Sequence, residues 1–185
     1  MRIDQIYLDM DGVLVDWFGG VCRLYERNKD YAEDHWPIGG ATECALQIDG
    51  DKMWEHIDLG GIHWWANLKP FPWVGELLSL FSGRVDQLSI LSSPANSAYA
   101  ATGKILWIKQ HVPGLADRVH LTADKHLLAR EGALLIDDND ENCRNFIEAG
   151  GQAIVFPQAW NEERICRHRP VDYLKARLEL SGIIS

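Results

Sequence analysis

The chain is organised around the stretch Ile6-Tyr7-Leu8-Asp9-Met10-Asp11-Gly12-Val13-Leu14. Its apolar beginning predicts a buried strand over residues 5–9, after which Gly12 allows the chain to turn away. Asp9 and Asp11, just past the end of this strand, can surround one small volume, which suits an oxygen-seeking cation and a nucleophilic carboxylate. The same residues are also compatible with a surface Asp-Gly turn. The rest of the chain has to distinguish a chemical site from a turn.

Beyond Pro70, short apolar strands alternate with helices. Apolar residues at helical spacing predict a helix over 74–81. Further strands are expected at 85–91, 119–122, 133–136 and 153–156, and further helices at 97–112 with a break near Gly103, at 125–130, around 143–147 and from Pro170. Strands that are short solid apolar runs, alternating with helices, are typical of a parallel sheet covered on both faces. The predicted fold class is therefore α/β, with a Rossmann-like parallel sheet.

The segment from Trp17 to about Lys69 has a different character. It is weakly periodic, it is interrupted by glycine pairs such as Gly39-Gly40, and it holds five of the eight tryptophans of the chain. Short helices and loops are expected here, without a strand pattern. We therefore expect a core made of residues 1–16 and 70–185, with residues 17–69 inserted after the first strand as a small helical cap.

Composition limits the partners that the chain can have. Of its 185 residues, 46% are hydrophobic and 24% are charged, as in ordinary soluble domains. The formal charge of −9 argues against electrostatic binding to nucleic acid polymers or to anionic membranes, and it suits an anionic substrate only if a divalent cation neutralises part of the site. Four cysteines without a C-x-x-C pair, no leader segment and no membrane-length apolar run predict a cytoplasmic protein. The oligomeric state stays open, a homodimer included.

Polar side chains gather at the ends of the predicted strands. Ser92 and Ser93 follow the second strand, and Lys125 lies just beyond the third. Asp137 and Asp138 follow the fourth. In parallel sheets these ends form the crevice where ligands bind, so the side chains should meet the two aspartates of the first strand. Mg²⁺ between the carboxylates, serines around phosphate oxygens and a lysine opposite the developing charge are the parts that phosphoryl transfer requires.

These residues resemble the four motifs of the haloacid dehalogenase superfamily of phosphatases, in the order that the superfamily has. Asp9-Met10-Asp11-Gly12-Val13-Leu14 is similar to motif I, and Leu91-Ser92 to the strand-ending Ser/Thr of motif II. Lys125 is similar to the lysine of motif III, and Leu135-Ile136-Asp137-Asp138 to the acidic motif IV. The resemblance implies the α/β core of that superfamily, with the insertion as a cap that closes over the substrate.

Within the superfamily the chain resembles the 5′(3′)-deoxyribonucleotidases over most of its length. Motif I continues in a similar way to Trp17, and the other resembling stretches are Trp64-Trp65 ahead of Leu68-Lys69-Pro70, Ile90-Leu91-Ser92-Ser93-Pro94, Lys104-Ile105-Leu106-Trp107-Ile108, Leu121-Thr122-Ala123-Asp124-Lys125 and Leu134-Leu135-Ile136-Asp137-Asp138. This resemblance implies an Mg²⁺-dependent hydrolase that dephosphorylates nucleoside or deoxynucleoside monophosphates. Ser92 stands where the family often has Thr, and Ala123 where mammalian members have Arg, so the sugar and base preference stays open.

The family also implies roles for individual residues. Asp9 would be the nucleophile that forms an aspartyl-phosphate, and Asp11 the acid and base. Mg²⁺ would be held by Asp9, the backbone carbonyl of Asp11 and Asp138, with Asp137 close by. The residues implied for phosphate binding are Ser92, Ser93, Lys104 and Lys125. The aromatic residues that could stack on the base are Trp17 and, on the opposite wall, Trp36 or the pair Trp64 and Trp65.

Other interpretations start from the same residues. The fold could act on a sugar phosphate or another small phosphomonoester, or it could serve as a silent interaction partner, although loss of Asp9 or Asp11 would be expected in that case. An acidic run that starts at Asp137 matches four positions of a calcium-binding loop, but Asn142 stands where that loop requires glycine. The tryptophans could belong to the core, and Lys104 to a solvated helix face. The base and the 5′ or 3′ position of the phosphate are not decided.

Overall fold

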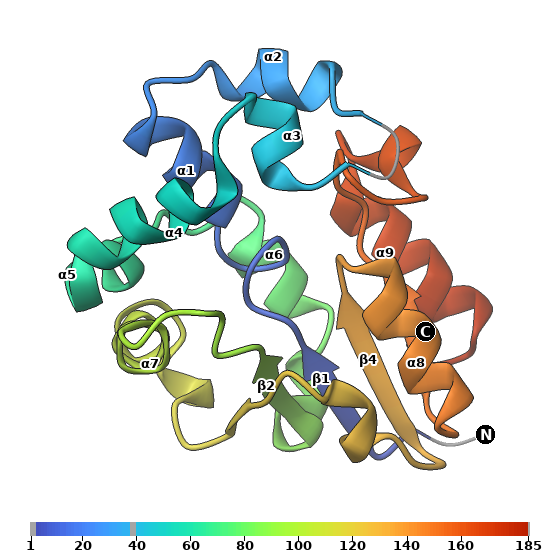
Figure 1. Cartoon of the computed structure of the whole chain (residues 1–185). Helices are drawn as coiled ribbons and strands as arrows, with labels where there is room; N and C mark the ends of the chain where they lie inside the picture. The colour runs from blue at the N-terminus through green and yellow to red at the C-terminus, as the bar shows by residue number, and fades with distance from the viewer. Residues whose placement is uncertain (1–2, 38–39, 185) are drawn as a thin grey trace.

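The computed structural model describes residues 3–37 and 40–184. Gly39, one of the glycines noted in the expected cap, lies outside these ranges. Figure 1 shows a sheet with helices around it. The described strands are all parallel and follow the order β3-β2-β1-β4-β5. They are β1 (Gln5–Leu8), β2 (Leu88–Ser92), β3 (Val119–Leu121), β4 (Ala133–Asp137) and β5 (Gln152–Val155). This parallel α/β sheet confirms the predicted fold class.

Helices lie on both faces of the sheet and beyond the ends of its strands. After Pro70 the α-helices are α6 (Val74–Ser79), α7 (Ala100–His111), α8 (Asp140–Glu148) and α9 (Pro170–Leu180). The 3-10 helices are η1 (Ser82–Gln87), η2 (Pro113–Leu115), η3 (Lys125–Leu128) and η4 (Arg164–Cys166). Between β1 and Pro70 the helices are α1 (Trp17–Leu24), α2 (Lys29–Asp34), α3 (Thr42–Leu46), α4 (Gly50–Leu59) and α5 (Gly61–Ala66).

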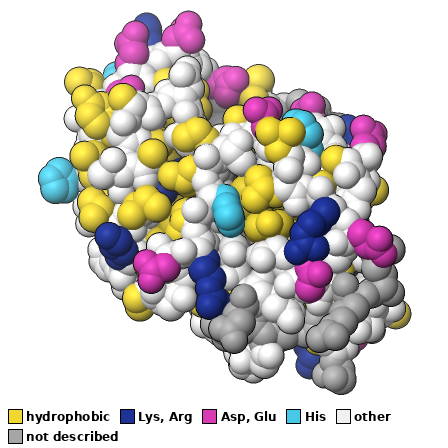
Figure 2. All heavy atoms as spheres, turned by 90° about the horizontal axis from the view of Figure 1, so that it is seen from below, with side chains coloured by type: hydrophobic (Ala, Val, Ile, Leu, Met, Phe, Trp, Pro, Cys, Tyr) yellow, Lys and Arg dark blue, Asp and Glu magenta, His cyan; other side chains and the backbone are white. Residues whose placement is uncertain are grey.

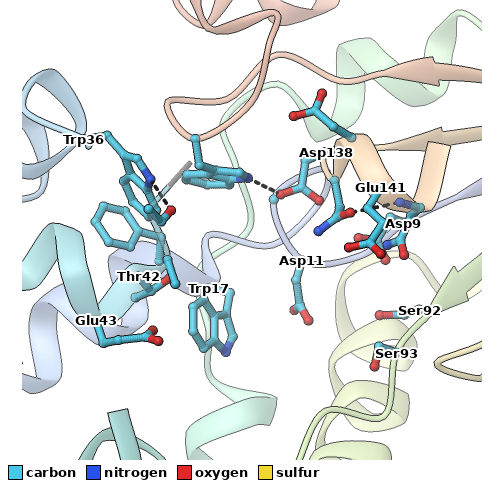
Figure 3. A pocket seen from close by; sticks show the side chains of 18 of the residues that line it. Asp9, Asp11, Trp17, Trp36, Thr42, Glu43, Ser92, Ser93, Asp138 and Glu141 are labelled. Carbon is cyan, nitrogen blue, oxygen red and sulfur yellow. Dashed lines mark hydrogen bonds between the residues drawn. The ribbon is translucent and has the colours of Figure 1, made fainter. Parts of the chain in front are cut away.

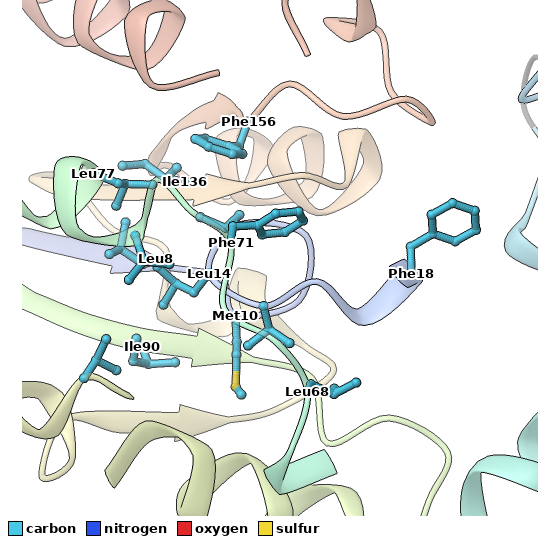
Figure 4. Packing of buried hydrophobic residues seen from close by; sticks show 14 of the residues in the cluster. Leu8, Met10, Leu14, Phe18, Leu68, Phe71, Leu77, Ile90, Ile136 and Phe156 are labelled. Atoms are coloured by element: carbon cyan, nitrogen blue, oxygen red, sulfur yellow. The ribbon is translucent and has the colours of Figure 1, made fainter. Parts of the chain in front are cut away.

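Successive side chains of β1 point to opposite faces of the sheet and join two different apolar clusters. Leu8 is in register with Ile90 of β2 and Ile136 of β4, and all three lie in the larger cluster together with Leu77 of α6. Figure 4 shows these four side chains close together. Tyr7 faces the smaller cluster, which includes buried residues of β4 and α8. Because the central strands run in register, their carboxyl ends form one continuous edge.

The helices α1 to α5 lie together beyond the carboxyl ends of the strands (Figure 1). The two linkers that lead into and out of this region run side by side. The backbone N–H of Asp16 donates to the carbonyl of Lys69 over 2.9 Å, and Val15 forms a bridge with Pro70. The arrangement is that of a cap on a sheet core, while the boundaries expected at residues 16/17 and 69/70 remain a prediction.

Two elements differ from the sequence-based expectation. α7 continues through Gly103 without the expected break. This glycine instead lets α5 approach closely, because a Cβ atom at Gly103 would collide with the side chain of Trp65. The strand expected from residue 85 begins at Leu88, where pairing with Ile6 of β1 starts, and the residues before it form η1. In both cases a tertiary contact decides what the local pattern left ambiguous.

No helix in the described ranges is long and apolar enough to cross a membrane. Figure 2 shows the face of the molecule seen from below in the view of Figure 1. On this face the lysine and arginine side chains lie among acidic ones and do not gather into a basic patch. The described side chains of this face therefore offer no continuous positive surface to a polyanion.

Candidate active site

The loop after β1 carries Asp9 and Asp11 to the edge of the sheet. The loop is closed by the backbone N–H of Gly12, which donates to the carbonyl of Val15 over 2.9 Å. Gly12 has a φ of 79°, in the left-handed region that favours glycine, and a Cβ atom there would collide with the carboxylate of Asp138. Glycine at this position therefore lets the loops after β1 and β4 come into contact. This contact brings Asp9 and Asp11 next to Asp138.

Lys125 lies between two carboxylates at the ends of neighbouring strands. Its Nζ is 2.7 Å from Oδ1 of Asp9 and donates a hydrogen bond of 2.6 Å to Oδ2 of Asp137. Each of these three side chains is at most 8% exposed. Asp137 also accepts hydrogen bonds from the backbone N–H of Asn139 (2.9 Å) and from the amide of Asn142 (3.2 Å to each oxygen). Asp137 is thus committed to neighbouring groups, whereas Lys125 keeps one of its three N–H donors for another ligand.

Lys104 of α7 is fully buried next to the other aspartate of the first loop. Its Nζ lies 2.5 Å from Oδ2 of Asp11, and it also donates to the carbonyl of Ser93 (2.6 Å) and to Oγ of Ser92 (3.1 Å). The ring centroid of Trp65 lies 5.4 Å from the same ammonium group. These hydrogen bonds use all three donors of the lysine. Lys104 therefore joins the end of β2 to Asp11, and it does not line the adjacent pocket.

The loop after β5 supports Asp138 from the opposite side. Nε1 of Trp160 donates to Oδ2 of Asp138 over 2.7 Å, and the amide of Asn161 donates to its backbone carbonyl over 2.8 Å. The side chain of Gln158 donates to the carbonyl of Gly12. Sequence reasoning missed these residues, and the only available signal was a pair of amide side chains shortly after a predicted strand. Gln158 and Asn161 thus fix the backbones of the loops after β1 and β4.

Burial and crowding change the acidity of the carboxyl groups. Burial raises the pKa of Asp11, although 28% of its side chain reaches solvent, and the neighbouring lysine only partly offsets this effect. Burial, followed by the charge of Asp9, raises the pKa of Asp137 to about 6 and raises that of Asp138 well above its usual range. Burial disfavours the charge of Lys125, but the two flanking carboxylates outweigh burial and raise its pKa. The site thus has an excess of negative charge that attracts a proton or a cation.

The donor atoms of this site fit a hard divalent cation. One oxygen from each of Asp9, Asp137 and Asp138 lies within 4.8 Å of the other two. Oδ1 of Asp9 is paired with Lys125, whereas Oδ1 of Asp11 is buried and accepts no hydrogen bond from a described group. Mg²⁺ takes oxygen ligands of this kind and shares its coordination with waters and phosphate. Clustered carboxylates, one of them with an unpartnered buried oxygen, are the expected environment for such an ion.

The alternative of a calcium-binding loop does not fit the structure. Such a loop wraps around its ion over twelve residues. Here the chain forms α8 from Asp140 to Glu148, so positions 4 to 12 of the sequence match lie in a regular helix. The first position, Asp137, is fully buried and bound to Lys125. The match to the loop pattern is therefore coincidental.

A pocket of about 600 Å³ opens above the carboxylates, between the core and the cap. Its floor includes Asp9, Asp11, Ser92, Ser93, Lys125 and Asp138, and the cap contributes Trp17, Phe18, Trp36, Glu43, Met53 and Trp54. Figure 3 shows Trp17, Trp36 and Glu43 on the side of the pocket opposite Asp9 and Ser92. The rings of Trp17 and Trp54 lie 5.9 Å apart at an angle of 37°. The pocket thus has an acidic, hydroxyl-lined floor and an aromatic wall.

The structure places two of the four candidate tryptophans elsewhere. Trp64 and Trp65 do not line this pocket. Trp65 is fully buried and packs against Gly103, while Trp64 stands edge-on to Trp17 at 6.5 Å. Trp54, which sequence reasoning did not single out, lines the pocket in their place. Its position depends on how α4 packs against α1, which no local pattern reveals.

Comparison with known proteins places this geometry in context. Residues 2–172 match the family described as "5' nucleotidase, deoxy (Pyrimidine), cytosolic type C protein". A human relative, the cytosolic type of 5′(3′)-deoxyribonucleotidase, is 31% identical over an alignment of 150 residues, and the match covers 75% of this chain and 72% of the relative.

Solved structures show the same fold at low sequence identity. A HAD family hydrolase from Deinococcus radiodurans, solved with bound phosphate and sodium, has a TM-score of 0.64 at 12% identity and covers 100% of this chain and 98% of its own. A HAD-hydrolase from Bacillus subtilis, solved with magnesium, has a TM-score of 0.58 at 11% identity and covers 96% and 99%. At these identities the likeness concerns the fold alone.

Proposed function

The chain belongs to the deoxy 5′-nucleotidase family of cytosolic type C, as its motifs predicted, and we propose that Asp9 is its nucleophile. In this proposal Asp9 attacks the phosphorus of deoxyribonucleoside monophosphates and the enzyme releases their phosphate. Family membership makes the protein a hydrolase of phosphoric monoesters. The observation that carries the proposal for individual residues is the pairing of each loop aspartate with its own buried lysine, Asp9 with Lys125 and Asp11 with Lys104. Each pairing suits a different step of the reaction.

Asp9 is suited to attack phosphorus. Its carboxylate is buried at the end of β1, and the ammonium group of Lys125 lies 2.7 Å from its Oδ1. In the first step a bond forms between a carboxylate oxygen of Asp9 and phosphorus, and the bond from phosphorus to the leaving nucleoside oxygen breaks. In the second step water attacks the aspartyl-phosphate and releases inorganic phosphate together with the free carboxylate. The remaining donor of Lys125 can bind a phosphate oxygen in both steps.

Asp11 is suited to carry the proton. Its pKa is raised by burial, so the protonated form is available to donate to the leaving oxygen in the first step. The carboxylate that results can accept a proton from water in the second step. Lys104 holds the other oxygen of Asp11 and has no donor left, so the structure supports a positioning role for this lysine over direct contact with phosphate.

We propose Mg²⁺ as the cofactor, held by Asp9, the backbone carbonyl of Asp11 and Asp138. When bound, this ion would neutralise negative charge on the carboxylates and on the transferring phosphoryl group. Asp137 is the least available of the acidic residues because four hydrogen bonds already engage it. Its role in the proposal is therefore to hold Lys125 in place.

The aromatic wall supports a nucleoside as the leaving group. A nucleobase can stack on the faces of Trp17, Trp36 or Trp54, whereas a sugar phosphate has no flat group to place there. Ser92 and Ser93, on the floor, would bind the phosphate oxygens. The similarity to a cytosolic relative supports a cytoplasmic location and a small-molecule substrate.

A substrate panel with Mg²⁺ tests this proposal. Phosphate release should be fastest with deoxyribonucleoside monophosphates, slower with ribonucleotides and slowest with sugar phosphates. Asp9→Asn should abolish turnover of every substrate, because the amide is not a nucleophile. Asp30→Asn, which changes an exposed acid of the cap, serves as the matched control and should not alter turnover. A sugar phosphate at the head of the panel would overturn the proposed substrate, and retained turnover in Asp9→Asn would overturn the proposed nucleophile.

A further inference from the structure

Trp160 connects the metal-binding carboxylate proposed above to the cap. Its Nε1 donates to Oδ2 of Asp138 over 2.7 Å, and the dashed line at Asp138 in Figure 3 marks this bond. Its ring packs against two residues of the cap region, with centroids 5.1 Å from Trp36 and 5.9 Å from Phe18. Trp160 itself comes from the loop after β5, which belongs to the core. One side chain thus contacts both the reacting centre and the cap.

Each end of this connection is fixed by further contacts. On the cap side, Trp36 is only 9% exposed and donates from Nε1 to the carbonyl of Gly40 over 2.8 Å. Phe18 packs on the same ring at a centroid distance of 4.9 Å. On the core side, Asn161 donates to the backbone carbonyls of Asp138 and Phe156 over 2.8 and 2.7 Å. The backbone of the loop is therefore held by the core, whereas the orientation of the Trp160 ring is held by the cap.

We infer that Trp160 is a positioning residue that makes the orientation of Asp138 depend on the position of the cap. With the cap in place, the indole N–H holds Oδ2 of Asp138, and Oδ1 would remain available to the proposed ion. If the cap moves away, Trp36 and Phe18 no longer pack on the indole ring, and its N–H is free to leave the carboxylate. The affinity for the metal should therefore be higher with the cap closed than with the cap open. Closure of the cap over the substrate would then also strengthen metal binding at Asp138.

Packing alone does not account for this arrangement. A tryptophan with a purely structural role could direct its N–H to any carbonyl, as Trp107 does towards Leu68 over 2.8 Å. Here the donor is directed at a carboxylate of the reacting centre. Hydrogen bonds to the ligands of a metal orient them, and their loss typically lowers metal affinity by about 10- to 100-fold.

Direct binding of Mn²⁺, measured by electron paramagnetic resonance without substrate, tests the inference. Trp160→Phe keeps an aromatic ring but removes the donor, and it should raise the Kd for Mn²⁺ by about tenfold. Trp107→Phe removes a buried indole hydrogen bond outside the site and should leave this Kd unchanged. Thermal unfolding of both variants verifies that they are folded. An unchanged Kd in Trp160→Phe would overturn the inference.

A double-mutant cycle tests the connection to the cap. Trp36→Ala should raise the Kd for Mn²⁺ in the same direction, because it removes packing from the indole ring. The double variant should bind no more weakly than Trp160→Phe alone, because both changes act through one N–H group. Additive effects would overturn the coupling. The inference rests on the proposal that Asp138 is a metal ligand, and the variant Asp138→Asn tests that proposal separately. Unchanged Mn²⁺ binding in Asp138→Asn would refute the proposed metal site itself.

Discussion

Replacing Asp137 with Asn should remove a specific pH dependence from the stability of the metal-free protein. The buried carboxyl group of Asp137 has its pKa raised to about 6 by burial and by the charge of Asp9. The folded protein therefore binds this proton more tightly than the unfolded chain does. As far as Asp137 is concerned, the free energy of unfolding is therefore highest at low pH. It falls as the pH rises from about 4 to above 6. Lys125 does not alter this trend, since its pKa is raised and it stays charged throughout.

The size of the effect follows from the shift. The usual value for this group is 3.8 and the value in the fold is about 6, a difference of about two pKa units, and each unit corresponds to about 1.4 kcal/mol. The full contribution is therefore about 3 kcal/mol, of which about half should be lost between about pH 5 and about pH 7.5. No reduction for solvent screening is needed, because the Asp137 side chain is fully buried.

Urea unfolding at these two pH values, in the presence of a chelator, measures the effect. The wild-type protein should lose about 1 to 2 kcal/mol more than Asp137→Asn between the two, because the amide does not titrate. The comparison of slopes removes the contribution of the histidines, whereas loss of the Asp137 charge also lowers the pKa of Asp138 and adds to the difference in the same direction. Equal slopes in the two proteins, or a wild-type stability that rises more steeply with pH than that of the variant, would refute the account of a strained buried carboxylate.

Three other predictions follow from the geometry of the site. Gly12→Ala should destabilise the protein by about 1–3 kcal/mol in urea unfolding, because Gly12 has a left-handed φ of 79°, whereas Gly114→Ala, where no atom lies in the way, should not. Lys104→Met should lower kcat by about 100-fold in steady-state assays, since Asp11 would lose the group that positions it, while the KM for the nucleotide should change little. Trp17→Ala should raise the KM for deoxynucleotides by about tenfold and leave hydrolysis of p-nitrophenyl phosphate unchanged, and an equal effect on both substrates would contradict base stacking.

The residues at the strand ends could be predicted because local sequence determines them. An apolar run followed by an aspartate pair indicates a strand and its end, and parallel pairing then places Asp9 and Asp138 at one edge of the sheet. Lys125 was accessible by the same reasoning, since it follows a short strand. The structure places all three on the floor of one pocket. Their proposed roles remain predictions that the variants above test.

Contacts between distant segments could not be predicted in this way. Lys104 is a charged residue on a helix, and local periodicity favours a solvated face for it, yet its side chain is fully buried among Asp11, Ser92 and Ser93. Only resemblance to a family singled it out. Trp160 reaches Asp138 from 22 residues away, and no pattern in its own loop indicates that contact. Such interactions arise from the way loops of different strands meet, and this depends on the whole fold.

The charge of the site explains how an acidic chain can handle an anionic substrate. The proposed reacting centre contains four carboxyl groups, counted as ionised, and two ammonium groups, so its formal charge is −4 + 2 = −2. The carboxyl groups are those of Asp9, Asp11, Asp137 and Asp138, and the ammonium groups are those of Lys104 and Lys125. A phosphate dianion would be repelled by that charge. A bound divalent cation brings the sum to zero, and a proton retained on Asp11, which its raised pKa favours, makes it positive. On the proposed mechanism, the cation and the proton that catalysis requires are therefore also what allows the phosphate to enter, and the −9 charge of the whole chain is no obstacle to binding.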